Sequence, residues 1–400
     1  MPDKIKGRDI IVVGQQPWDT EIGSNCKNIA LEFSKDNRVL YINSPLDRIT
    51  LYRSKNDPKT QKRLEIIKGK QEGLIQIEQQ LWNYYPDCMV ESINWIGSTR
   101  IFDFFNRLNN VKLAKSIAKA ISELNFKDFI LFNDNEIFKG FYLNDFLKPA
   151  VSIYYSRDYM VAVDYWKKHG EKLEPQLIAK NDICVANSTF LAQYCQKYNP
   201  NSYYVGQGCE LDIFFPEKAK DLPADLSGLK RPLIGYVGAL QSIRLDIELI
   251  EYIAFARPEW TIVLVGPENE VFKNSGLHQL GNVIFTGAKA VAELPDYINA
   301  FDVCINPQLV NEVTIGNYPR KIDEYLAIGK PVVATNTKAM ETFKDFVYLA
   351  ASKDDYVTLI EKALKDDSEQ EQHKRREFAL GHTWENSVSA IYQAVIGTGK

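Results

Sequence analysis

Short apolar runs of four to six residues alternate along this chain with longer segments in which apolar residues recur at helical spacing. Such runs are typical of strands buried on both faces, and their alternation with helices is typical of a parallel sheet with crossover connections. The pattern therefore predicts the α/β class. In the first half the predicted elements are strands 9–14, 38–42, 129–132, 151–155 and 183–186, helix 25–33, and a helix after residue 186 capped by Asn187 or Ser188.

The alternation breaks between residues 214 and 232, where the chain is rich in proline and charge and has no apolar period. We predict an interdomain linker at 215–232. Beyond it the predicted elements are strands 233–237, 261–265, 283–286, 303–306 and 331–335 and helices 245–255, 294–301 and 319–328. Because 400 residues exceed what one hydrophobic core usually organises, we expect two Rossmann-like domains, 1–214 and 233–383, that face a central cleft. The last helix, 384–396, is expected to pack on the second domain or to return to the first.

The composition argues against several classes of protein. Hydrophobic residues make up 45% of the chain and charged residues 25%, and the mean hydropathy is -0.28, as in globular proteins. A net charge of -4 argues against binding to nucleic acid, which needs an excess of basic residues. Six scattered cysteines without a C-x-x-C spacing favour a reducing compartment, and four histidines without ligand spacing argue against a zinc site. Neither a signal peptide nor an apolar run of about 18 residues is found, so we expect a cytoplasmic protein.

One segment, residues 48–70, is strongly basic, with eight lysines and arginines against two acids, a local net of 8 - 2 = +6. A charge run of this kind is usually a solvated helix and loop. The alternative is docking to an anionic membrane surface, which gains about 1 kcal/mol per basic residue. Aromatic residues nearby that we expect to be exposed would support this alternative, namely Trp82, Tyr84, Tyr85 and Trp95. His169 lies among lysines, and we expect it at the surface.

The most informative stretch reads NYPRKIDEYLAIGKPVVA, from residue 317 to 334. Pro319 suits the first position of a helix and Gly329 suits its end. Lys321 and Glu324 are then three residues apart on one face, close to the helix start. Because the start of a crossover helix lies at the carboxyl edge of a parallel sheet, free N–H groups and the Lys321 ammonium are placed to hold a diphosphate there. The Glu324 carboxylate is placed to accept hydrogen bonds from ribose hydroxyls. An ordinary surface pair of the two side chains is the alternative.

This stretch resembles the donor-binding signature of family-4 glycosyltransferases of the GT-B fold, in the branch written P-x-K-x-x-E-Y-L-A-x-G-K-P-V-V. The matching residues are Pro319, Lys321, Glu324, Tyr325, Leu326, Ala327, Gly329, Lys330, Pro331, Val332 and Val333. Four further segments are similar to the family: GYVGAL at 235–240, TIVLVGP at 261–267, VIFTG at 283–287 and HTWENSVSAIY at 382–392. The first domain matches more loosely, through QPWDTEIGSN after its first strand and ANSTFLA near Ala186.

The resemblance implies a transferase that moves a sugar from a nucleotide diphosphate-sugar, a UDP- or GDP-sugar, held by the second domain. It also implies retention of configuration, with neither a cofactor nor a metal, since no Asp-x-Asp motif lies in a suitable loop. The implied acceptor is a glycan or a lipid-linked glycan of the cell envelope. The implied donor-binding residues are Glu324, Gly238, Gly266, Thr286, Gly287, Gly316, Asn317 and, in the loop after the first strand, Gly23; the implied catalytic residues are Lys321, Arg244 and Asp158.

Three positions carry open questions. Many members of the family have a glutamate where this chain has Gly316, so we expect Glu312, Thr314 or backbone N–H groups to replace it. Many also carry a basic residue soon after the first glycine turn, a part that Arg244 is placed to play here, unless it is a surface charge at the helix start. Asp158 either orients the acceptor hydroxyl or caps the following helix.

Fixed positive charge at the departing diphosphate is expected to dominate catalysis, and by the resemblance the leaving phosphate itself takes the acceptor proton. Two other functions compete with transfer. A non-hydrolysing sugar-nucleotide epimerase shares the fold but needs a paired acid and base, which the sequence does not identify. A non-catalytic sugar-binding module would explain why Gly316 replaces the family's glutamate and why Ala239 replaces its basic residue after the first glycine turn.

Overall fold

The chain divides into two compact units, residues 1–206 with 384–400 and residues 207–383. The computed structural model describes residues 4–20, 24–215, 217, 222–316 and 318–399. The predicted linker, 215–232, does not separate the units, because the chain passes from the first to the second at residue 207. Phe214, just before that segment, and Leu226, within it, are buried in the core of the second unit. The many prolines and charged residues of the segment led to the prediction of a linker, although a few of its apolar residues pack in the core.

The first unit is built on an eight-stranded sheet of order β10-β9-β8-β7-β1-β2-β5-β4, in which only β4 runs antiparallel to its neighbour. Its strands are β1 (Asp9–Gly14), β2 (Arg38–Ile42), β4 (Leu74–Glu78), β5 (Leu81–Tyr84), β7 (Ile130–Asp134), β8 (Val151–Ser156), β9 (Ile183–Ala186) and β10 (Ser202–Tyr204); β3 (Leu46–Asp47) and β6 (Met89–Val90) form a separate pair. Its helices are α1 (Asn25–Ser34), α2 (Arg48–Arg53), α3 (Pro58–Ile67), α4 (Thr99–Leu124), α5 (Leu143–Leu147), α6 (Asp164–Lys180), α7 (Thr189–Gln196) and α14 (Trp384–Ile396).

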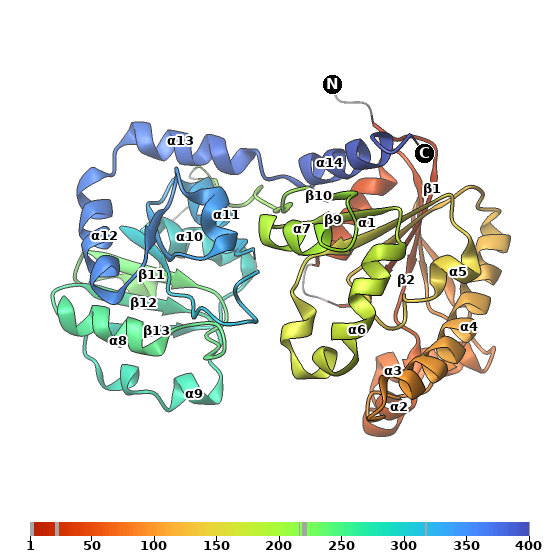
Figure 1. The fold of residues 1–400 in the computed structure, drawn as a ribbon. Helices are drawn as coiled ribbons and strands as arrows, with labels where there is room; N and C mark the ends of the chain where they lie inside the picture. Colours follow the sequence, from red (N-terminus) through yellow and green to blue (C-terminus); the bar gives the residue numbers. More distant parts are fainter. Residues whose placement is uncertain (1–3, 21–23, 216, 218–221, 317, 400) are drawn as a thin grey trace. The chain divides into compact units, whose positions relative to one another are not determined.

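Side chains alternate across this sheet, as the pleat of a strand requires. Ile10 and Val12 of β1 pack with α1 and α14 on one face, while Ile11 and Val13 pack with α4 on the other. The last helix thus lies against the first one, although the two are far apart in sequence (Figure 1). Ser188 is the residue that caps α7, since its side chain accepts a hydrogen bond from the Leu191 N–H.

The second unit has a fully parallel six-stranded sheet of order β13-β12-β11-β14-β15-β16. Its strands are β11 (Leu233–Val237), β12 (Thr261–Val265), β13 (Val283–Gly287), β14 (Val303–Asn306), β15 (Val332–Thr335) and β16 (Tyr348–Ala350), and its helices are α8 (Ile247–Ala256), α9 (Glu270–Lys273), α10 (Leu294–Ala300), α11 (Lys321–Ile328), α12 (Lys353–Asp366) and α13 (Glu369–Leu380). Side chains from α10 and α11 pack in the core on one face and side chains from α8 and α12 in the core on the other. Helix α11 begins at Lys321, two residues later than predicted, and ends at Gly329 in the left-handed conformation that glycine favours.

Candidate functional site

Three glycines lie side by side at the carboxyl ends of β11, β12 and β13. The Gly238 N–H donates to the Val265 carbonyl and the Gly266 N–H donates to the Gly287 carbonyl, each at 2.9 Å. Gly238 and Gly266 have φ values of +141° and +147°, and a Cβ at Gly266 would stand 2.0 Å from the Gly238 oxygen. Only glycine permits this approach of two turns. The two turns lie at the carboxyl edge of the sheet, beside the point where strand order reverses, between β11 and β14.

The Lys321 ammonium lies at this edge. Its Nζ donates to the Tyr236 hydroxyl at 2.7 Å and stands 4.5 Å from the centre of that ring. A Cβ on Gly238 would be 3.2 Å from the same nitrogen, so the glycine makes room for the charge. Tyr236 was not predicted as a site residue. The sequence did contain a signal for it, namely a tyrosine near the end of a buried strand, beside the glycine turn.

Tyr325, one turn after Lys321, fixes the helix to the sheet. Its hydroxyl accepts from the Val237 N–H at 2.8 Å and donates to the Val237 carbonyl at 3.3 Å. Strand β14 pairs with β11 only at Ile234 and Gly235, so the end of β11 needs another partner. The position of Lys321 therefore follows from a backbone requirement of the sheet.

Glu324 is partly buried on the same first turn of α11. Burial raises the pKa of its carboxyl, while the positive charges of Arg320 and Lys321 oppose that rise. The predicted free N–H groups at the helix start are only partly available, because the Ile322 N–H donates to the Pro319 carbonyl at 2.9 Å and the Asp323 N–H to the Arg320 carbonyl at 3.0 Å. The N–H groups of Ile322 and Asp323 are therefore occupied by hydrogen bonds to the residues just before the helix. Side-chain charge is thus the main feature that this end of α11 offers to an anion.

A buried network holds the first turn of α11 from the other side. Asp323 is fully buried and lies 2.5 Å from His382 Nδ1, while the Cys209 Sγ donates to its second oxygen at 3.2 Å. The Tyr318 hydroxyl is 3.2 Å from the same His382 nitrogen. Sequence reasoning missed this network, although Asp323 lies between the two predicted site residues. A carboxylate buried with such partners positions the helix rather than binding a ligand.

The loop after β14 uses its polar side chains internally. The buried Thr314 hydroxyl donates to the Leu309 carbonyl, so it is not available as the predicted replacement for the missing glutamate. Gly316 is buried and Glu312 is exposed, and Asn317 lies outside the described residues. The Arg244 side chain is exposed, and its carbonyl accepts from the Leu309 N–H at 2.9 Å. The structure brings the backbone of Arg244 to this loop and leaves its guanidinium in solvent.

Thr286 is the penultimate residue of strand β13 and lies next to Gly287. Its hydroxyl oxygen is shielded from solvent and has no hydrogen-bond partner among the described residues. The structure therefore places Thr286 beside the glycine turns with an unused donor and acceptor, which costs about 1–3 kcal/mol if left unmet.

In the first unit Asp158 belongs to an ion-pair cluster. The Arg157 guanidinium donates to Asp158 Oδ2 at 2.8 Å and to Asp134 Oδ1 at 2.9 Å. Asp134 is fully buried at the end of β7, and burial raises the pKa of its carboxyl, against the effect of the Arg157 charge. Asp158 does not cap a helix: the caps of the next two helical segments are Tyr159 and Val163. The helix-cap alternative is therefore wrong, and the acceptor role stays a prediction.

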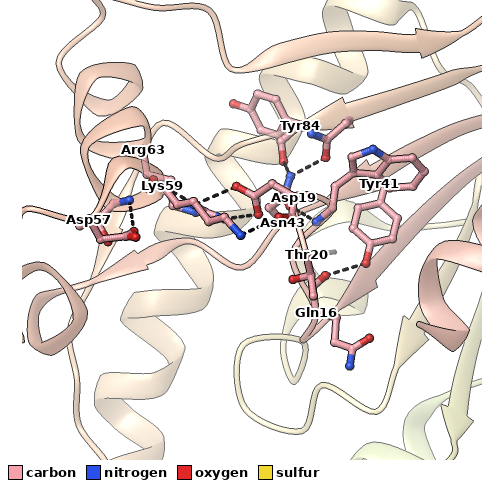
Figure 2. Close-up of polar contacts among 12 residues, drawn as sticks. Gln16, Asp19, Thr20, Tyr41, Asn43, Asp57, Lys59, Arg63 and Tyr84 are labelled. Carbon is pink, nitrogen blue, oxygen red and sulfur yellow. Dashed lines mark hydrogen bonds and ion pairs between the residues drawn. The ribbon is translucent and has the colours of Figure 1, made fainter. Parts of the chain in front are cut away.

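The loop between β1 and α1 is tied to α3 by two basic residues (Figure 2). Arg63 donates both terminal nitrogens to the Asp19 carboxylate at 3.1 and 3.3 Å, and Lys59 Nζ donates to the Asp19 carbonyl at 2.7 Å. The Tyr41 hydroxyl donates to the Gln16 carbonyl at 2.6 Å. Gly23, predicted in this loop, lies outside the described residues. Sequence reasoning assigned these two charges to a surface, whereas the structure uses them to hold a loop.

Most charges of segment 48–70 have partners within the first unit. Arg48 pairs with Glu91, Lys68 and Lys70 pair with Glu65, and Lys62 stands 4.3 Å from the centre of a tyrosine ring. The predicted exposed aromatics are partly wrong: Tyr84 and Tyr85 are buried, Trp82 is partly buried, and Trp95 is exposed. His169 is also buried, because it stacks on Phe102 with ring centres 4.0 Å apart. The net charge of +6 overstates what this segment presents to a partner.

In the described ranges no group of three histidine, cysteine, aspartate or glutamate side chains is arranged to hold a metal ion. Within the same ranges no helix combines the length and the apolar character that crossing a membrane requires.

Residues 231–366 match the family described as glycosyl transferases group 1. The match runs from β11 to the end of α12 and includes the three glycine turns and α11. The matched residues lie within the second unit, so the similarity to this family is a property of that unit. A relative from Bacillus subtilis (strain 168), named as the teichuronic acid biosynthesis glycosyltransferase TuaH, is 28% identical over 232 residues. That alignment spans 55% of this chain and 58% of TuaH, which is less than two thirds of either protein.

Solved structures share the fold over nearly the whole chain. Sucrose-phosphate synthase from Thermosynechococcus elongatus is 16% identical with a TM-score of 0.67, and the match covers 98% of each chain. Anabaena HepE in complex with UDP is 14% identical with a TM-score of 0.66, covering 98% of this chain and all of HepE. The fold is α/β with parallel sheets, of the GT-B type that we expected from the motif.

Proposed function

We propose that this chain is a glycosyltransferase that moves a sugar from a nucleotide diphosphate-sugar to a glycan or lipid-linked acceptor. One observation carries the proposal: the Lys321 ammonium reaches the glycine turns at the carboxyl edge of the second sheet, 2.7 Å from Tyr236, with Glu324 on the same helix turn. A fixed cation at that edge suits a departing diphosphate, and a carboxylate beside it suits ribose hydroxyls. The match to the group 1 family over residues 231–366 supports this assignment.

The finer assignments rest on the sequence motif and on the names of similar proteins. We infer a UDP- or GDP-sugar as donor; solved structures of HepE and of an E. coli protein with UDP-2-fluoro glucose support a UDP-sugar. The name of TuaH supports a role in cell-envelope polysaccharide synthesis. Membership of family 4, retention of configuration and proton uptake by the leaving phosphate follow from the resemblance of the motif alone. Lys321 and the exposed Arg244 supply the charge, and Asp158 orients the acceptor.

The proposal is tested by thermal unfolding of the protein with UDP-, GDP- and ADP-sugars. A donor present at 100 times its Kd stabilises the folded state by about 2.7 kcal/mol. We expect one donor class to raise the midpoint in the wild type, and Lys321→Ala to lower the affinity at least tenfold. Lys338→Ala removes an exposed lysine of the same unit and serves as the matched control. If no nucleotide-sugar shifts the midpoint, or if the donor is epimerised without an acceptor, the proposed transfer is wrong.

A further inference from the structure

A cavity of about 670 Å³ opens in the first unit, at the carboxyl edge of its sheet. Its wall includes Gln15, which follows β1, Ser44, which follows β2, and Glu136, which follows β7. Strand order reverses between β1 and β7, and ligands of open α/β sheets bind outside such a point. The position of the cavity in the fold is therefore that of a binding site.

One part of the wall is aromatic. Phe138 and Trp166 stack with ring centres 5.1 Å apart, and Tyr165 meets Trp166 edge to face at 5.1 Å. Flat aromatic faces contact the C–H surfaces of small polar molecules such as sugars while excluding water. Trp95 also lines the cavity, with 76% of its surface exposed.

The rest of the wall is polar. Asn94 Oδ1 is shielded from solvent and has no hydrogen-bond partner among the described residues. Glu136 is buried and uses one oxygen, Oε1, to accept from the N–H groups of Phe138 and Lys139. Lys139 Nζ in turn donates to the Ser44 hydroxyl at 3.3 Å. Aromatic faces combined with amide, carboxylate and hydroxyl groups suit a molecule with many hydroxyls, such as a saccharide.

Exposed apolar side chains continue from the cavity along α2 and α4. Ile49 lines the cavity and is 43% exposed, and Tyr52, one turn further along α2, is 88% exposed. On α4, Phe102, Asn106 and Asn109 line the cavity at helical spacing. The neighbouring stripe of α4 is apolar and exposed, and consists of Ile101, Phe105 and Leu108, with Phe104 beside it. Clusters of exposed apolar residues next to a polar site mark contact with another apolar body.

The cavity is lined by three carboxylates, Asp47, Glu91 and Glu136, and by two cations, Arg53 and Lys139. Arg53 lines the cavity, is exposed, and makes no ion pair with any residue in the described part of the chain. A guanidinium in this position suits an anionic group, phosphate above all, that stands between a sugar and an apolar chain.

We propose that this cavity binds the saccharide head of a lipid-carried acceptor, whose aliphatic chain lies against the apolar residues of α2 and α4. The proposal rests on the transferase function and names the class of its acceptor. The sugar then contacts the aromatic and polar wall of the cavity, and the anionic linker lies at Arg53. The lipid chain lies along the exposed apolar stripe.

Binding is measured by calorimetry, without any donor, using decyl glycosides of glucose, galactose and N-acetylglucosamine below their micellar concentrations. The free sugars and a decyl ether without sugar are the comparison ligands. We expect at least one glycoside to bind tenfold more tightly than both its free sugar and the ether. Equal affinity for the free sugar, equal affinity for the ether, or no binding by any glycoside overturns the proposal.

Variants divide the site into its parts. Asn94→Ala is expected to weaken binding of the glycoside and of the free sugar by about tenfold, and Tyr165→Ala, at a 56% exposed position, tests the same wall with little risk to folding. Tyr52→Ser should weaken the glycoside alone. Phe255→Ser, which removes a 69% exposed ring from the second unit, is the matched control and should change nothing. If all four variants bind the glycoside with the affinity of the wild type, the ligand does not bind in this cavity.

The role of Arg53 is tested with decyl glucosyl phosphate. It should bind more tightly than decyl glucoside to the wild type, and equally to Arg53→Ala; an unchanged preference in the variant overturns the role of this arginine. Lys321→Ala separates this proposal from the proposed function, since it should lose the donor-induced shift in unfolding midpoint and keep its affinity for the glycoside. Donor binding without glycoside binding leaves the transferase proposal intact and rejects the lipid-carried acceptor.

Discussion

At the scale of single residues, two glycines and a tyrosine decide where the Lys321 ammonium lies. Gly238 leaves the space that Nζ occupies, Gly266 lets the neighbouring turn approach, and Tyr236 provides both a hydrogen bond and a ring face for the cation. Each of these residues acts through its shape at a strand end rather than through reactivity. Substitutions at Gly238 and Tyr236 should therefore change binding, whereas a side chain at Gly266 would clash with the Gly238 backbone and disturb folding as well.

Gly238→Ala is expected to displace the ammonium, because the new methyl group would stand 3.2 Å from Nζ and 3.0 Å from the Tyr236 hydroxyl, at a φ of +141°. The strained backbone should cost about 1–3 kcal/mol of stability. Titration with the donor identified by thermal unfolding should show an affinity at least tenfold lower. Gly281→Ala, where a methyl group meets nothing within 4 Å, is the control. Unchanged donor affinity in Gly238→Ala would separate the glycine turn from the binding site.

Glu324 should make donor binding depend on pH. Its burial raises the pKa of the carboxyl, so protonation begins at a higher pH than for an exposed glutamate. The protonated carboxyl is a poorer acceptor for ribose hydroxyls, so the donor Kd of the wild type should rise as the pH falls through that raised pKa. Glu324→Gln should bind weakly at pH 7.5 and lose this pH dependence. A wild-type Kd that is constant from pH 7.5 to pH 5 would contradict the ribose role.

At the scale of elements, buried polar groups tie helices to sheets in both units. Tyr325 joins α11 to the end of β11, and Asp323 joins the same helix to His382. In the first unit Glu174 of α6 accepts hydrogen bonds from Tyr154 of β8 at 2.7 Å and from Tyr194 of α7 at 3.1 Å. These contacts set the positions of helices that apolar packing alone leaves free to slide.

Glu174 should reduce stability as the pH rises. Burial raises the pKa of its carboxyl to about 7, above the ordinary value near 4.5. Below about pH 4 the group is neutral in both states; as the pH rises towards 7 the unfolded chain ionises first, which stabilises it by on the order of 3 kcal/mol. Glu174→Gln should therefore be more stable than the wild type at pH 8 and similar at pH 4, as measured by urea unfolding. Glu171→Gln, at an exposed site on α6, should show no such difference. If Glu174→Gln and the wild type are equally stable at pH 8 as well as at pH 4, the raised pKa is contradicted.

At the scale of the whole molecule, the chain completes its first unit with its last helix. Residues 384–400 belong to the first unit, although the second unit intervenes in sequence. Ile391 is buried there, Tyr392 accepts a hydrogen bond from Asn37 Nδ2 at 2.9 Å, and its ring lies 5.7 Å from that of Phe33. The stability of the first unit thus depends on a segment that follows the second unit in sequence.

Ile391→Ala is expected to destabilise the first unit by about 2–5 kcal/mol, the usual cost of a cavity in a well-packed core. The stability of the second unit should stay the same, because Ile391 packs in the first unit. Hydrogen exchange followed by mass spectrometry reads the two units separately. Ile396→Ala, on the exposed end of the same helix, is the control. Faster exchange throughout the second unit would show that the helix stabilises both.

From the order of the amino acids one can predict the fold class, most strands, the end of α11 at Gly329 and the placement of Lys321 and Glu324 on one helix turn. These features depend on local periods and on residues close together in the chain. Contacts between residues distant in sequence could not be predicted, because they depend on how the whole chain folds. Tyr236 beneath Lys321, His382 beside Asp323 and the use of Arg63 to hold Asp19 join residues 44 to 85 positions apart. The boundary at residue 207 and the cavity beside α4 have the same origin, since burial depends on which distant segments pack together.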